Sequence, residues 1–388
     1  MTALAIAALS CVIWIYLLAA RGGFWRTTQR DAVATSALRP DIAWPPVTAV
    51  IPARDEAAVI GETIRSLLRQ DYPGSFELIV VDDHSNDDTC GVARRAALAV
   101  GAAERLTVVA APTLPEGWTG KLWSLQHGIR LAETLPEPPD YLLLTDADIH
   151  YTDRVLMELV RRAVHDDLVL TSLMVKLRCV SFAERALIPA FVFFFQMLYP
   201  FAWVNRADRR TAAAAGGCML VQRRALDVAG GIAAIRSELI DDCALARLLK
   251  ANGKIWLGLT DRAVSARACA SVNDARRMIS RCAYAQLRYS PWWLAVTSSG
   301  MLVTYLAPFA LVLFTSGPSQ LLGALAWLLM ALALQPTLRF YGVTPWWGLA
   351  LPAIAGAYLV FTLDSAWQHL SGTGSEWKGR VYPGASAQ

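Results

Sequence analysis

Two groups of carboxylates follow short apolar runs in this sequence, at Asp82-Asp83 and at Asp146-Ala147-Asp148. Short, continuously apolar runs are typical of strands buried in a parallel sheet, and ligands of such sheets bind beyond the carboxyl ends of the strands. Asp146 and Asp148 are spaced so that they point the same way along an extended chain. Their hard oxygen atoms suit Mg²⁺ or Mn²⁺ that carries phosphates. A solvated turn is the alternative interpretation of Asp-Ala-Asp taken alone.

A third polar segment, Pro52-Ala-Arg54-Asp55-Glu56, also follows an apolar run. Arg54 can pair with phosphate, and a carboxylate can accept a hydrogen bond from the N–H of a nucleobase. We therefore expect three strand ends to meet at one crevice. The stretch after Asp82 lacks the central Gly and the terminal Glu of an EF-hand loop, which argues against that calcium site. Neither G-x-G-x-x-G nor a P-loop lysine motif follows the first strand, which argues against a dinucleotide oxidoreductase and an ATPase.

The elements that would position these residues alternate between strands and helices. Strands are predicted at 48–51, 76–81, 106–110 and 141–144, with helices at 57–70, 87–100 and 121–132. This alternation predicts βαβ units and a doubly wound, mostly parallel sheet of the α/β class. Further strands are predicted at 168–175 and 218–222, and a further helix at 239–250.

The composition of the 388 residues points to a protein with membrane segments. Hydrophobic residues make up 55% of the chain, with 14 Trp, which is high for a soluble enzyme. The net charge is only +4, so nucleic acid is not indicated as a partner. The seven cysteines form no C-x-x-C pair and are typical of reduced thiols in a cytosol-facing protein.

The N-terminal residues 3–20 are almost wholly apolar and are followed by Arg21, Arg26 and Arg30. This length is enough to span a bilayer, and the missing basic residues before it argue against a cleaved signal peptide. The positive-inside rule predicts the N-terminus outside and the following chain in the cytoplasm.

Three apolar segments near the C-terminus, at 293–314, 321–334 and 347–361, predict a second transmembrane region. An odd number of spans there would place the tail outside, whereas Lys378 and Arg380 favour the inside. The topology of this end therefore stays open at the level of sequence.

A further apolar stretch, 187–204, contains two prolines and has basic residues on both flanks. Both ends would be cytoplasmic by the positive-inside rule, so an interfacial or re-entrant segment is predicted. A buried pair of core helices is the alternative.

These motifs together resemble the family 2 glycosyltransferases with the GT-A fold, over roughly residues 47–288. The matching segments are Ile51-Pro-Ala-Arg-Asp-Glu56, Leu78-Ile-Val-Val-Asp-Asp83, Gly120-Lys121 with Leu125-Gln-His-Gly128-Ile129, Asp146-Ala-Asp148, Gly216-Gly217-Cys218-Met219 and Ile240-Asp241-Asp242-Cys-Ala-Leu245. The chain departs from the family pattern in that Asp241 replaces a Glu and the Gln-x-x-Arg-Trp signature is absent. Arg277, Arg281 and Gln286 occupy the region of that signature.

The closest resemblance is to the hopene-associated glycosyltransferases. It rests on Trp118-Thr-Gly-Lys-Leu-Trp123, Ile188-Pro-Ala-Phe-Val-Phe-Phe-Phe195, Ala212-Ala-Ala-Ala-Gly-Gly-Cys-Met-Leu220 and Gln286-Leu-Arg-Tyr-Ser-Pro291.

The resemblance implies an inverting transfer from a nucleotide-diphosphate sugar and a role for each matched residue. Asp242 would be the catalytic base, although a helix N-terminal carboxylate is the alternative interpretation. Asp148 would bind the metal ion, Mg²⁺ or Mn²⁺, and Arg281 would be a possible phosphate contact. The residues implied to bind the nucleotide sugar are Pro52, Arg54, Asp55, Glu56, Asp83, Lys121 and Asp146. Those implied on the acceptor side are Gly216, Gly217 and Asp241.

The predicted protein is a membrane-bound glycosyltransferase whose acceptor is a lipid, hopanoid-like, and whose catalytic domain faces the cytoplasm at a bacterial inner membrane. Its predicted parts are a transmembrane helix at 1–22, a linker at 23–46, a GT-A domain at 47–290 with the apolar insertion 187–204, a transmembrane region at 291–366 and a polar tail at 367–388. Two alternatives remain. One is an enzyme of the same fold that makes a polyprenyl-phosphate sugar or a polysaccharide, and the other is a membrane scaffold that binds a nucleotide sugar without turnover.

Overall fold

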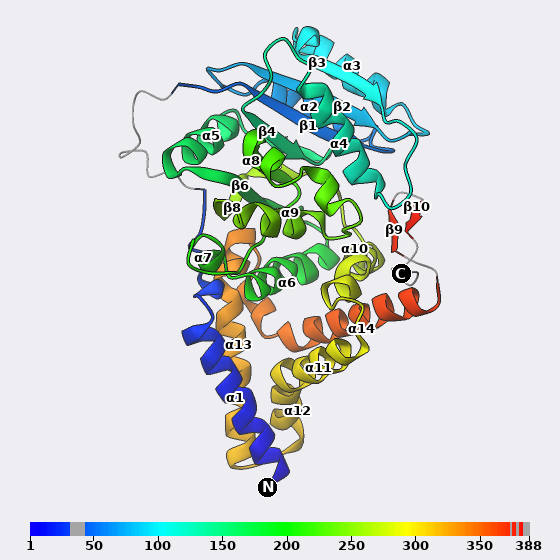
Figure 1. Ribbon diagram of the computed structural model, residues 1–388. Helices are drawn as coiled ribbons and strands as arrows, with labels where there is room; N and C mark the ends of the chain where they lie inside the picture. Colours follow the sequence, from blue (N-terminus) through cyan, green and yellow to red (C-terminus); the bar gives the residue numbers. More distant parts are fainter. Residues whose placement is uncertain (32–42, 373–374, 378–379, 383–388) are drawn as a thin grey trace. The chain divides into compact units, whose positions relative to one another are not determined.

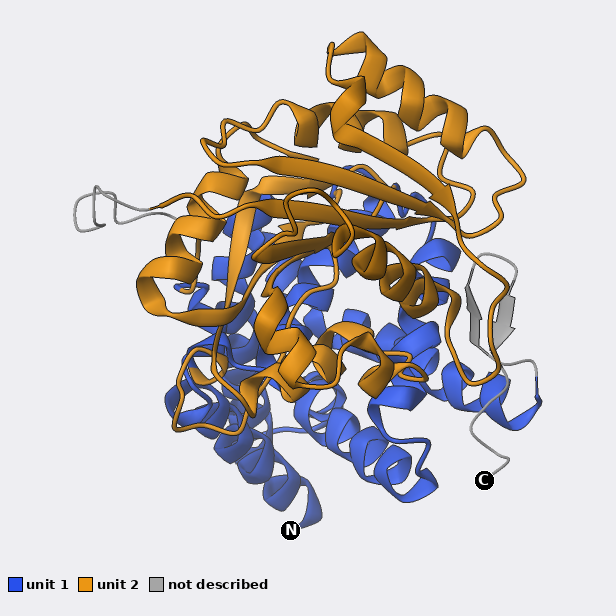
Figure 2. Cartoon of the chain, turned by 45° about the horizontal axis from the view of Figure 1, so that its top comes forward, with its two compact units in different colours: residues 1–28, 179–202, 268–388 blue, residues 29–178, 203–267 orange. Residues whose placement is uncertain are grey.

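The computed structural model describes residues 1–31, 43–372, 375–377 and 380–382. The chain forms two compact units (Figure 2). Unit 1 comprises residues 1–28, 179–202 and 268–388, and unit 2 comprises residues 29–178 and 203–267. Residues 32–42 of the predicted linker and residues 373–374, 378–379 and 383–388 of the predicted tail lie outside the described residues.

Unit 2 contains an eight-stranded sheet in the order β3-β2-β1-β4-β7-β6-β8-β5 (Figure 1). The strands β3, β2, β1 and β4 are parallel to one another, whereas β7 is antiparallel to β4 and β6, and β5 is antiparallel to β8. β6 and β8 are parallel to each other. The sheet is therefore mixed, and only its first half is parallel throughout, as the sequence predicted for most of the sheet. The strands are β1 Val47–Ala53, β2 Phe76–Asp82, β3 Leu106–Ala110, β4 Tyr141–Thr145, β5 Ile149–Tyr151, β6 Leu168–Lys176, β7 Cys218–Gln222 and β8 Lys254–Ser265.

The central strands are continuously apolar because helices cover both of their faces. All seven residues of β1 are buried, and alternate ones, such as Ile51, join a core with Ile60 and Ile64 of α2. On the other face Gly128 of α4 lies so close to Val50 that a Cβ on the glycine would be 2.4 Å from Val50 Cγ1. Only glycine permits this approach of helix to sheet.

The helices of unit 2 agree closely with the sequence predictions. They are α2 Ile60–Leu68, α3 Thr89–Ala99, α4 Gly120–Ala132, α5 Val155–Asp166, α8 Arg223–Val228 and α9 Asp241–Lys250, with 3₁₀ turns at Ala103–Arg105 and Ile232–Ile235. α5, α8, β5 and β8 were not predicted. Of these, β8 has the greatest consequence, because the chain that follows it reaches the site described below.

Unit 1 is helical in the described residues apart from one short hairpin. The helices are α1 Thr2–Ala20, α6 Phe182–Leu198, α7 Phe201–Val204 at the boundary with unit 2, α10 Val272–Gln286, α11 Pro291–Met301, α12 Ala307–Phe314, α13 Pro318–Tyr341 and α14 Leu351–Leu370. A π-helical turn at Leu302–Leu306 joins α11 to α12, and 3₁₀ turns occur at Phe24–Arg26 and Pro345–Gly348. The hairpin consists of β9 Ser375–Trp377 and β10 Arg380–Tyr382. α10, which the sequence analysis assigned to the soluble domain, packs against α6 and α14 through Ala275 and Ile279.

Polar side chains of α1 compensate for an irregular backbone in the neighbouring helix. Pro308 has no N–H, so the carbonyl of Thr304 lacks its usual helical partner, and Trp14 Nε1 donates to this oxygen at 2.9 Å. Ser10 Oγ donates to the carbonyl of Val303 in the π-helical turn at 2.6 Å. Backbone polar groups must be satisfied in this way wherever water is excluded.

Four helices among the described residues are long and apolar enough to cross a membrane by length and composition. They are Thr2–Ala20, Phe182–Val204, Pro291–Phe314 and Pro318–Tyr341. The predicted interfacial stretch 187–204 thus lies within α6 and α7, and Pro189 is accommodated inside α6. The last predicted segment, 347–361, corresponds to α14, which is not among the four.

Candidate active site

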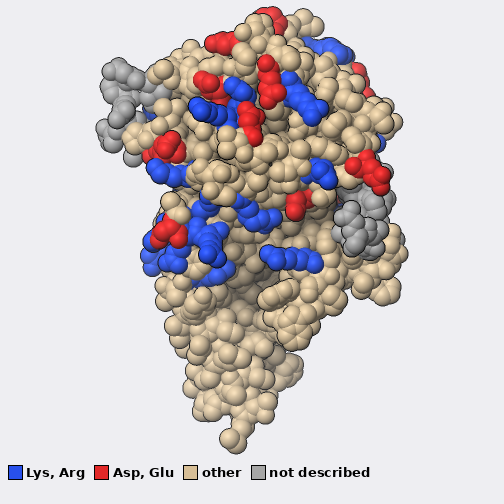
Figure 3. Space-filling model, in the orientation of Figure 1, with Lys and Arg blue, Asp and Glu red and all other residues tan. Residues whose placement is uncertain are grey.

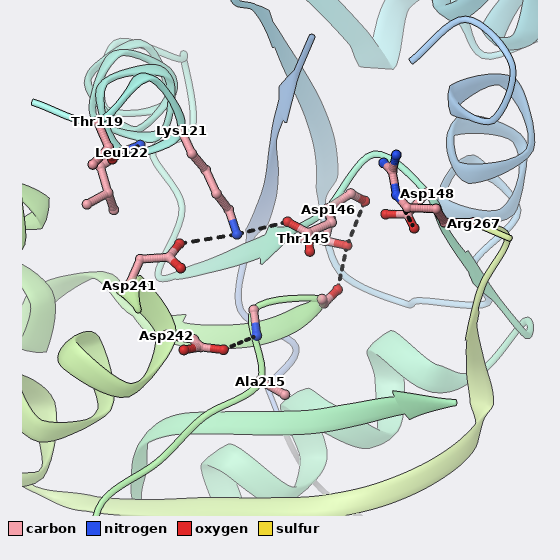
Figure 4. A network of polar contacts seen from close by, with 12 residues as sticks. Thr119, Lys121, Leu122, Thr145, Asp146, Asp148, Ala215, Asp241, Asp242 and Arg267 are labelled. Atoms are coloured by element: carbon pink, nitrogen blue, oxygen red, sulfur yellow. Dashed lines mark hydrogen bonds and ion pairs between the residues drawn. The ribbon is translucent and has the colours of Figure 1, made fainter. Parts of the chain in front are cut away.

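Lys121 is the central cation of a polar network in unit 2 (Figure 4). Its Nζ lies 3.0 Å from Asp146 Oδ1 and 3.1 Å from Asp241 Oδ2. Lys121 is placed by the first turn of α4, where the Thr119 side chain caps the helix by accepting from Leu122 N. Burial opposes its charged form, but the carboxylates of Asp146 and Asp241 outweigh burial and raise the pKa of Lys121. The ammonium group therefore stays charged and holds the end of β4 against the start of α9.

Asp242 lies next to this network, in the first turn of α9. Its Oδ2 accepts from Gly216 N at 3.0 Å and its Oδ1 from Cys243 N at 2.6 Å. Burial and the neighbouring Asp241 carboxylate raise the pKa of Asp242 to about 6, although Lys121 and the two backbone donors act in the opposite direction. A carboxylate with its pKa raised toward neutrality is suited to general base catalysis.

The two glycines predicted on the acceptor side, Gly216 and Gly217, have different structural roles. A Cβ on Gly216 would lie 3.2 Å from Lys121 Nζ and 3.6 Å from Asp242 Oδ2, so a side chain there would crowd the network. The carbonyl of Gly217 accepts from the hydroxyls of Thr145 and Tyr151, at 2.9 and 3.0 Å. Gly217 therefore fixes the segment before β7 to the end of β4.

Asp148 is nearly buried, with 6% of its surface exposed. Its Oδ2 accepts from Ser265 Oγ at 2.6 Å and lies 3.4 Å from Arg267 Nε. The same guanidinium donates through Nη2 to Glu56 Oε1 at 2.6 Å. Burial opposes the charge of Arg267, but Asp148 and Glu56 outweigh it and raise the pKa of Arg267.

The ends of β1 and β2 are joined by a separate set of contacts. Asp83 N donates to the carbonyl of Ala53 at 2.7 Å, and Arg54 Nη1 donates to the carbonyl of Asp83 at 2.5 Å. Asp55 has a left-handed backbone with φ 51°, a conformation that aspartate tolerates better than most residues. It is held there by Ser85 Oγ, which accepts from Asp55 N at 2.9 Å.

The donor chemistry of Asp146 and Asp148 fits a divalent cation. Both offer carboxylate oxygens, and the structure already places a cationic nitrogen against each, from Lys121 and from Arg267. No cluster of three or more His, Cys, Asp or Glu with metal-ligand geometry occurs among the described residues. An ion held here would complete its coordination with water or phosphate oxygens, as Mg²⁺ commonly does.

Most of the predicted site residues lie at these three groups of contacts within unit 2. Pro52 is buried in β1 opposite Val81 and supports the strand end from which Arg54 and Asp55 extend. Arg281 lies on α10 in unit 1, and its phosphate contact stays a prediction.

Ser265, Arg267 and Tyr151 were missed by the sequence analysis. They depend on β5 and β8, which pair in the structure. The run of β-branched and apolar residues from Lys254 to Ser265 is the signal that could have revealed β8.

Comparison with solved structures finds several that are similar to this chain. A mannosyltransferase from Pyrobaculum calidifontis, solved with GDP-Man and Mn²⁺, is 21% identical, with 91% of this chain and 99% of that chain covered and a TM-score of 0.55. TarS from S. aureus is 16% identical over 62% of this chain and 40% of that chain, with a TM-score of 0.41. Mannosyl-3-phosphoglycerate synthase from Rubrobacter xylanophilus is 18% identical over 63% of this chain and 74% of that chain, with a TM-score of 0.38. None of the curated proteins compared with the chain matches it.

The family model described as glycosyltransferase like family 2 matches residues 45–277. This match spans more than half of the chain and contains the strand ends, Lys121, the Asp-Ala-Asp segment and Asp242. The mixed sheet is GT-A-like, in agreement with the fold shared with the Pyrobaculum mannosyltransferase. The chain therefore belongs to the glycosyltransferase like family 2 and is a glycosyltransferase.

Proposed function

We propose that this protein transfers a sugar from a nucleotide-diphosphate sugar to the hydroxyl of a membrane lipid, with inversion at the anomeric carbon. The observation that carries the proposal is Asp242, a carboxylate with a raised pKa. Two backbone N–H groups fix it next to Asp241, which pairs with the charged Lys121. The solved mannosyltransferase that shares the fold binds GDP-Man and Mn²⁺, and we propose the same classes of ligand here.

Asp242 acts as the general base in this proposal. Two backbone N–H groups orient the carboxylate, so that it takes the proton from the acceptor hydroxyl as the hydroxyl oxygen attacks the anomeric carbon. The bond from that carbon to the diphosphate breaks on the opposite face, and the diphosphate leaves with the bonding electron pair. General base catalysis of this kind contributes about 10²- to 10⁴-fold to the rate.

The leaving diphosphate gains negative charge, and the site supplies positive charge to meet it. Asp148, assisted by Asp146, would hold Mg²⁺ or Mn²⁺, which would neutralise the diphosphate. Lys121 stays charged beside Asp146 and adds fixed positive charge. The segments that end β1 and β2, with Arg54, Asp55 and Asp83, would hold the nucleoside.

The helices of unit 1 support a lipid bilayer as the medium of the acceptor. Large apolar side chains of α1, α12 and α13 are exposed, including Val12 (62%), Phe314 (83%) and Leu321 (72%). On the face shown in Figure 3 these helices carry no Lys, Arg, Asp or Glu at their lower end. The helix Pro318–Tyr341 has 24 residues and is about 36 Å long at 1.5 Å per residue, enough to cross the hydrocarbon core.

The contacts of α1 support three crossings and one orientation. Ser10 contacts Val303 in the turn before α12, and Cys11 contacts Leu322 of α13. Arg21 directly follows α1, Arg288 precedes α11 and Arg339 is in the last turn of α13. Each arginine is thus at the end of its helix away from the α12–α13 connection, beside which the N-terminus lies (Figure 1). By the positive-inside rule that end is cytoplasmic. Three crossings place the N-terminus outside and the catalytic residues and the tail inside, in the bacterial inner membrane. α6 and α14 would then lie at the interface.

We propose a hopanoid-like acceptor because the sequence motifs resemble those of the hopene-associated glycosyltransferases. Analysis of cellular lipids tests this part of the proposal. Comparative mass spectrometry of lipids from cells with and without the gene should show one lipid class that differs by the mass of one sugar. A hopanoid carrying that sugar would support the acceptor, and a glycosylated polyprenyl phosphate would replace it.

Purified full-length protein tests the chemistry directly. With a nucleotide-diphosphate sugar and total lipid extract, release of nucleoside diphosphate should need Mg²⁺ or Mn²⁺. Asp242→Asn should lower the lipid-dependent release about 10²- to 10⁴-fold. Asp88→Asn, which changes an exposed carboxylate of unit 2, should leave it unchanged. Turnover in the Asp242→Asn protein equal to that of the wild type would contradict the base assignment.

A further inference from the structure

Arg267 bridges two nearly buried carboxylates that come from different strand ends. Glu56, 7% exposed, follows β1, and Asp148, 6% exposed, follows β4. The Arg267 side chain itself retains 46% of its exposure, so it contacts both carboxylates from the solvent side.

The backbone around Arg267 is fixed to Asp148. Ala266 N donates to the carbonyl of Asp148 at 2.8 Å, Ser265 Oγ donates to Asp148 Oδ2, and Arg267 N donates to Ser265 Oγ at 3.3 Å. The guanidinium thus reaches Asp148, the same carboxylate that the proposed function assigns to a divalent ion.

The two guanidinium contacts are unequal. The Nη2 contact to Glu56 is 2.6 Å, whereas the Nε contact to Asp148 is 3.4 Å. Glu56 is itself held by its backbone N–H, which donates to Thr89 Oγ1 at 2.8 Å. Arg267 therefore has a firm partner in Glu56 that remains when the contact to Asp148 is lost.

We propose that Arg267 competes with the divalent ion for Asp148 and sets the affinity of the site for that ion. This inference rests on the proposed function, because it takes Asp148 as the metal ligand. An ion on Asp148 Oδ2 repels the guanidinium at a few ångströms, and the half-exposed side chain withdraws onto Glu56. Arg267 is a positioning residue in this role, and it keeps Asp148 paired when ion concentrations are low.

The experiment is a Mn²⁺ titration of the full-length protein at pH 7.5, in which the electron paramagnetic resonance signal of free Mn²⁺ reports binding. Arg267→Met removes the charge and keeps similar length, and we expect it to tighten Mn²⁺ binding about tenfold, or ~1.4 kcal/mol. Arg267→Lys keeps a charge but cannot span both carboxylates, and binding should be tighter by about threefold. Arg95→Met, which removes an exposed arginine of the same unit, is the matched control and should leave binding unchanged.

The outcomes separate this inference from the proposed function. If Arg267→Met binds Mn²⁺ as tightly as the wild type or more weakly, the competition is overturned. If Arg267→Met does not fold, an Arg267→Lys protein with the Mn²⁺ affinity of the wild type overturns it. If Arg267→Met binds Mn²⁺ and the wild type does not, the competition is supported. If neither protein binds Mn²⁺, the competition is overturned. Asp148→Asn should abolish binding in every background. If it does not, the metal assignment of the proposed function fails, whatever the Arg267 variants do.

Discussion

Replacement of Asp242 by Asn should make the protein far less active and, near neutral pH, more stable. The folded protein raises the pKa of Asp242 from 3.8 to about 6 through burial and the adjacent Asp241. A folded-state pKa above the unfolded one means that ionisation destabilises the fold. This cost is absent below pH 3.8, grows between pH 3.8 and about 6, and is complete above about 6.

The size of the effect follows from two opposing contributions. A shift of this size corresponds to about 3 kcal/mol at most, and solvent access reduces it to about 2 kcal/mol. Asn can accept only one of the two backbone hydrogen bonds that Asp242 accepts from Gly216 and Cys243, which costs about 1 kcal/mol. We expect a net gain of about 1 kcal/mol at pH 7.5, or roughly 2–4 °C in the unfolding midpoint.

The assay is thermal unfolding of both proteins at pH 7.5 and at pH 4.5, beside turnover at pH 7.5. The stability advantage of Asp242→Asn should disappear at pH 4.5, because the wild-type carboxyl is then protonated in the folded state. Turnover should fall about 10²- to 10⁴-fold. An Asn variant that is less stable than the wild type by the same amount at both pH values would refute the claim that ionised Asp242 destabilises the fold.

Four further results should follow. In the wild type, kcat/KM should decrease as the pH falls below about 6, with a limiting slope of one proton, as a pH–rate profile would show. Lys121→Met should move that acid limb to higher pH, because Lys121 opposes the raised pKa of Asp242; an unmoved limb would separate Lys121 from the base. Gly216→Ala should lower kcat at least tenfold with an unchanged circular dichroism spectrum, because its Cβ would lie 3.2 Å from Lys121 Nζ. Phe195→Ser, in a partly exposed position of α6, should reduce transfer to lipid but retain donor hydrolysis, whereas Phe193→Ser should destabilise the protein, because Phe193 is fully buried.

The contrast between Phe193 and Phe195 shows where sequence reasoning ended. The apolar stretch 187–204 is one block by composition, and the sequence predicts an interfacial or re-entrant segment for all of it. In the structure Phe193 packs on Phe24 of the same unit, with ring centroids 5.2 Å apart. Its burial arises from a contact between residues far apart in the chain, which periodicity alone does not indicate.

Sequence alone was sufficient for features that depend on local pattern. The strand ends at Asp83 and Asp146, the first turn of α9 with Asp242, and the apolar helices follow from short runs of residues whose burial or exposure is dictated by hydropathy. The parallel direction of β1, β2, β3 and β4 follows because each crossover in this half carries its own predicted helix.

Tertiary structure alone decided which charges meet. The antiparallel insertion of β7 between β4 and β6 brings Gly216 to Asp242, and the pairing of β8 with β5 brings Ser265 and Arg267 to Asp148. Gly216 and Asp242 are 26 residues apart in the chain, and Asp148 and Ser265 are 117 residues apart. Electrostatic energy depends on distance in space and on burial, and the order of residues along the chain specifies neither.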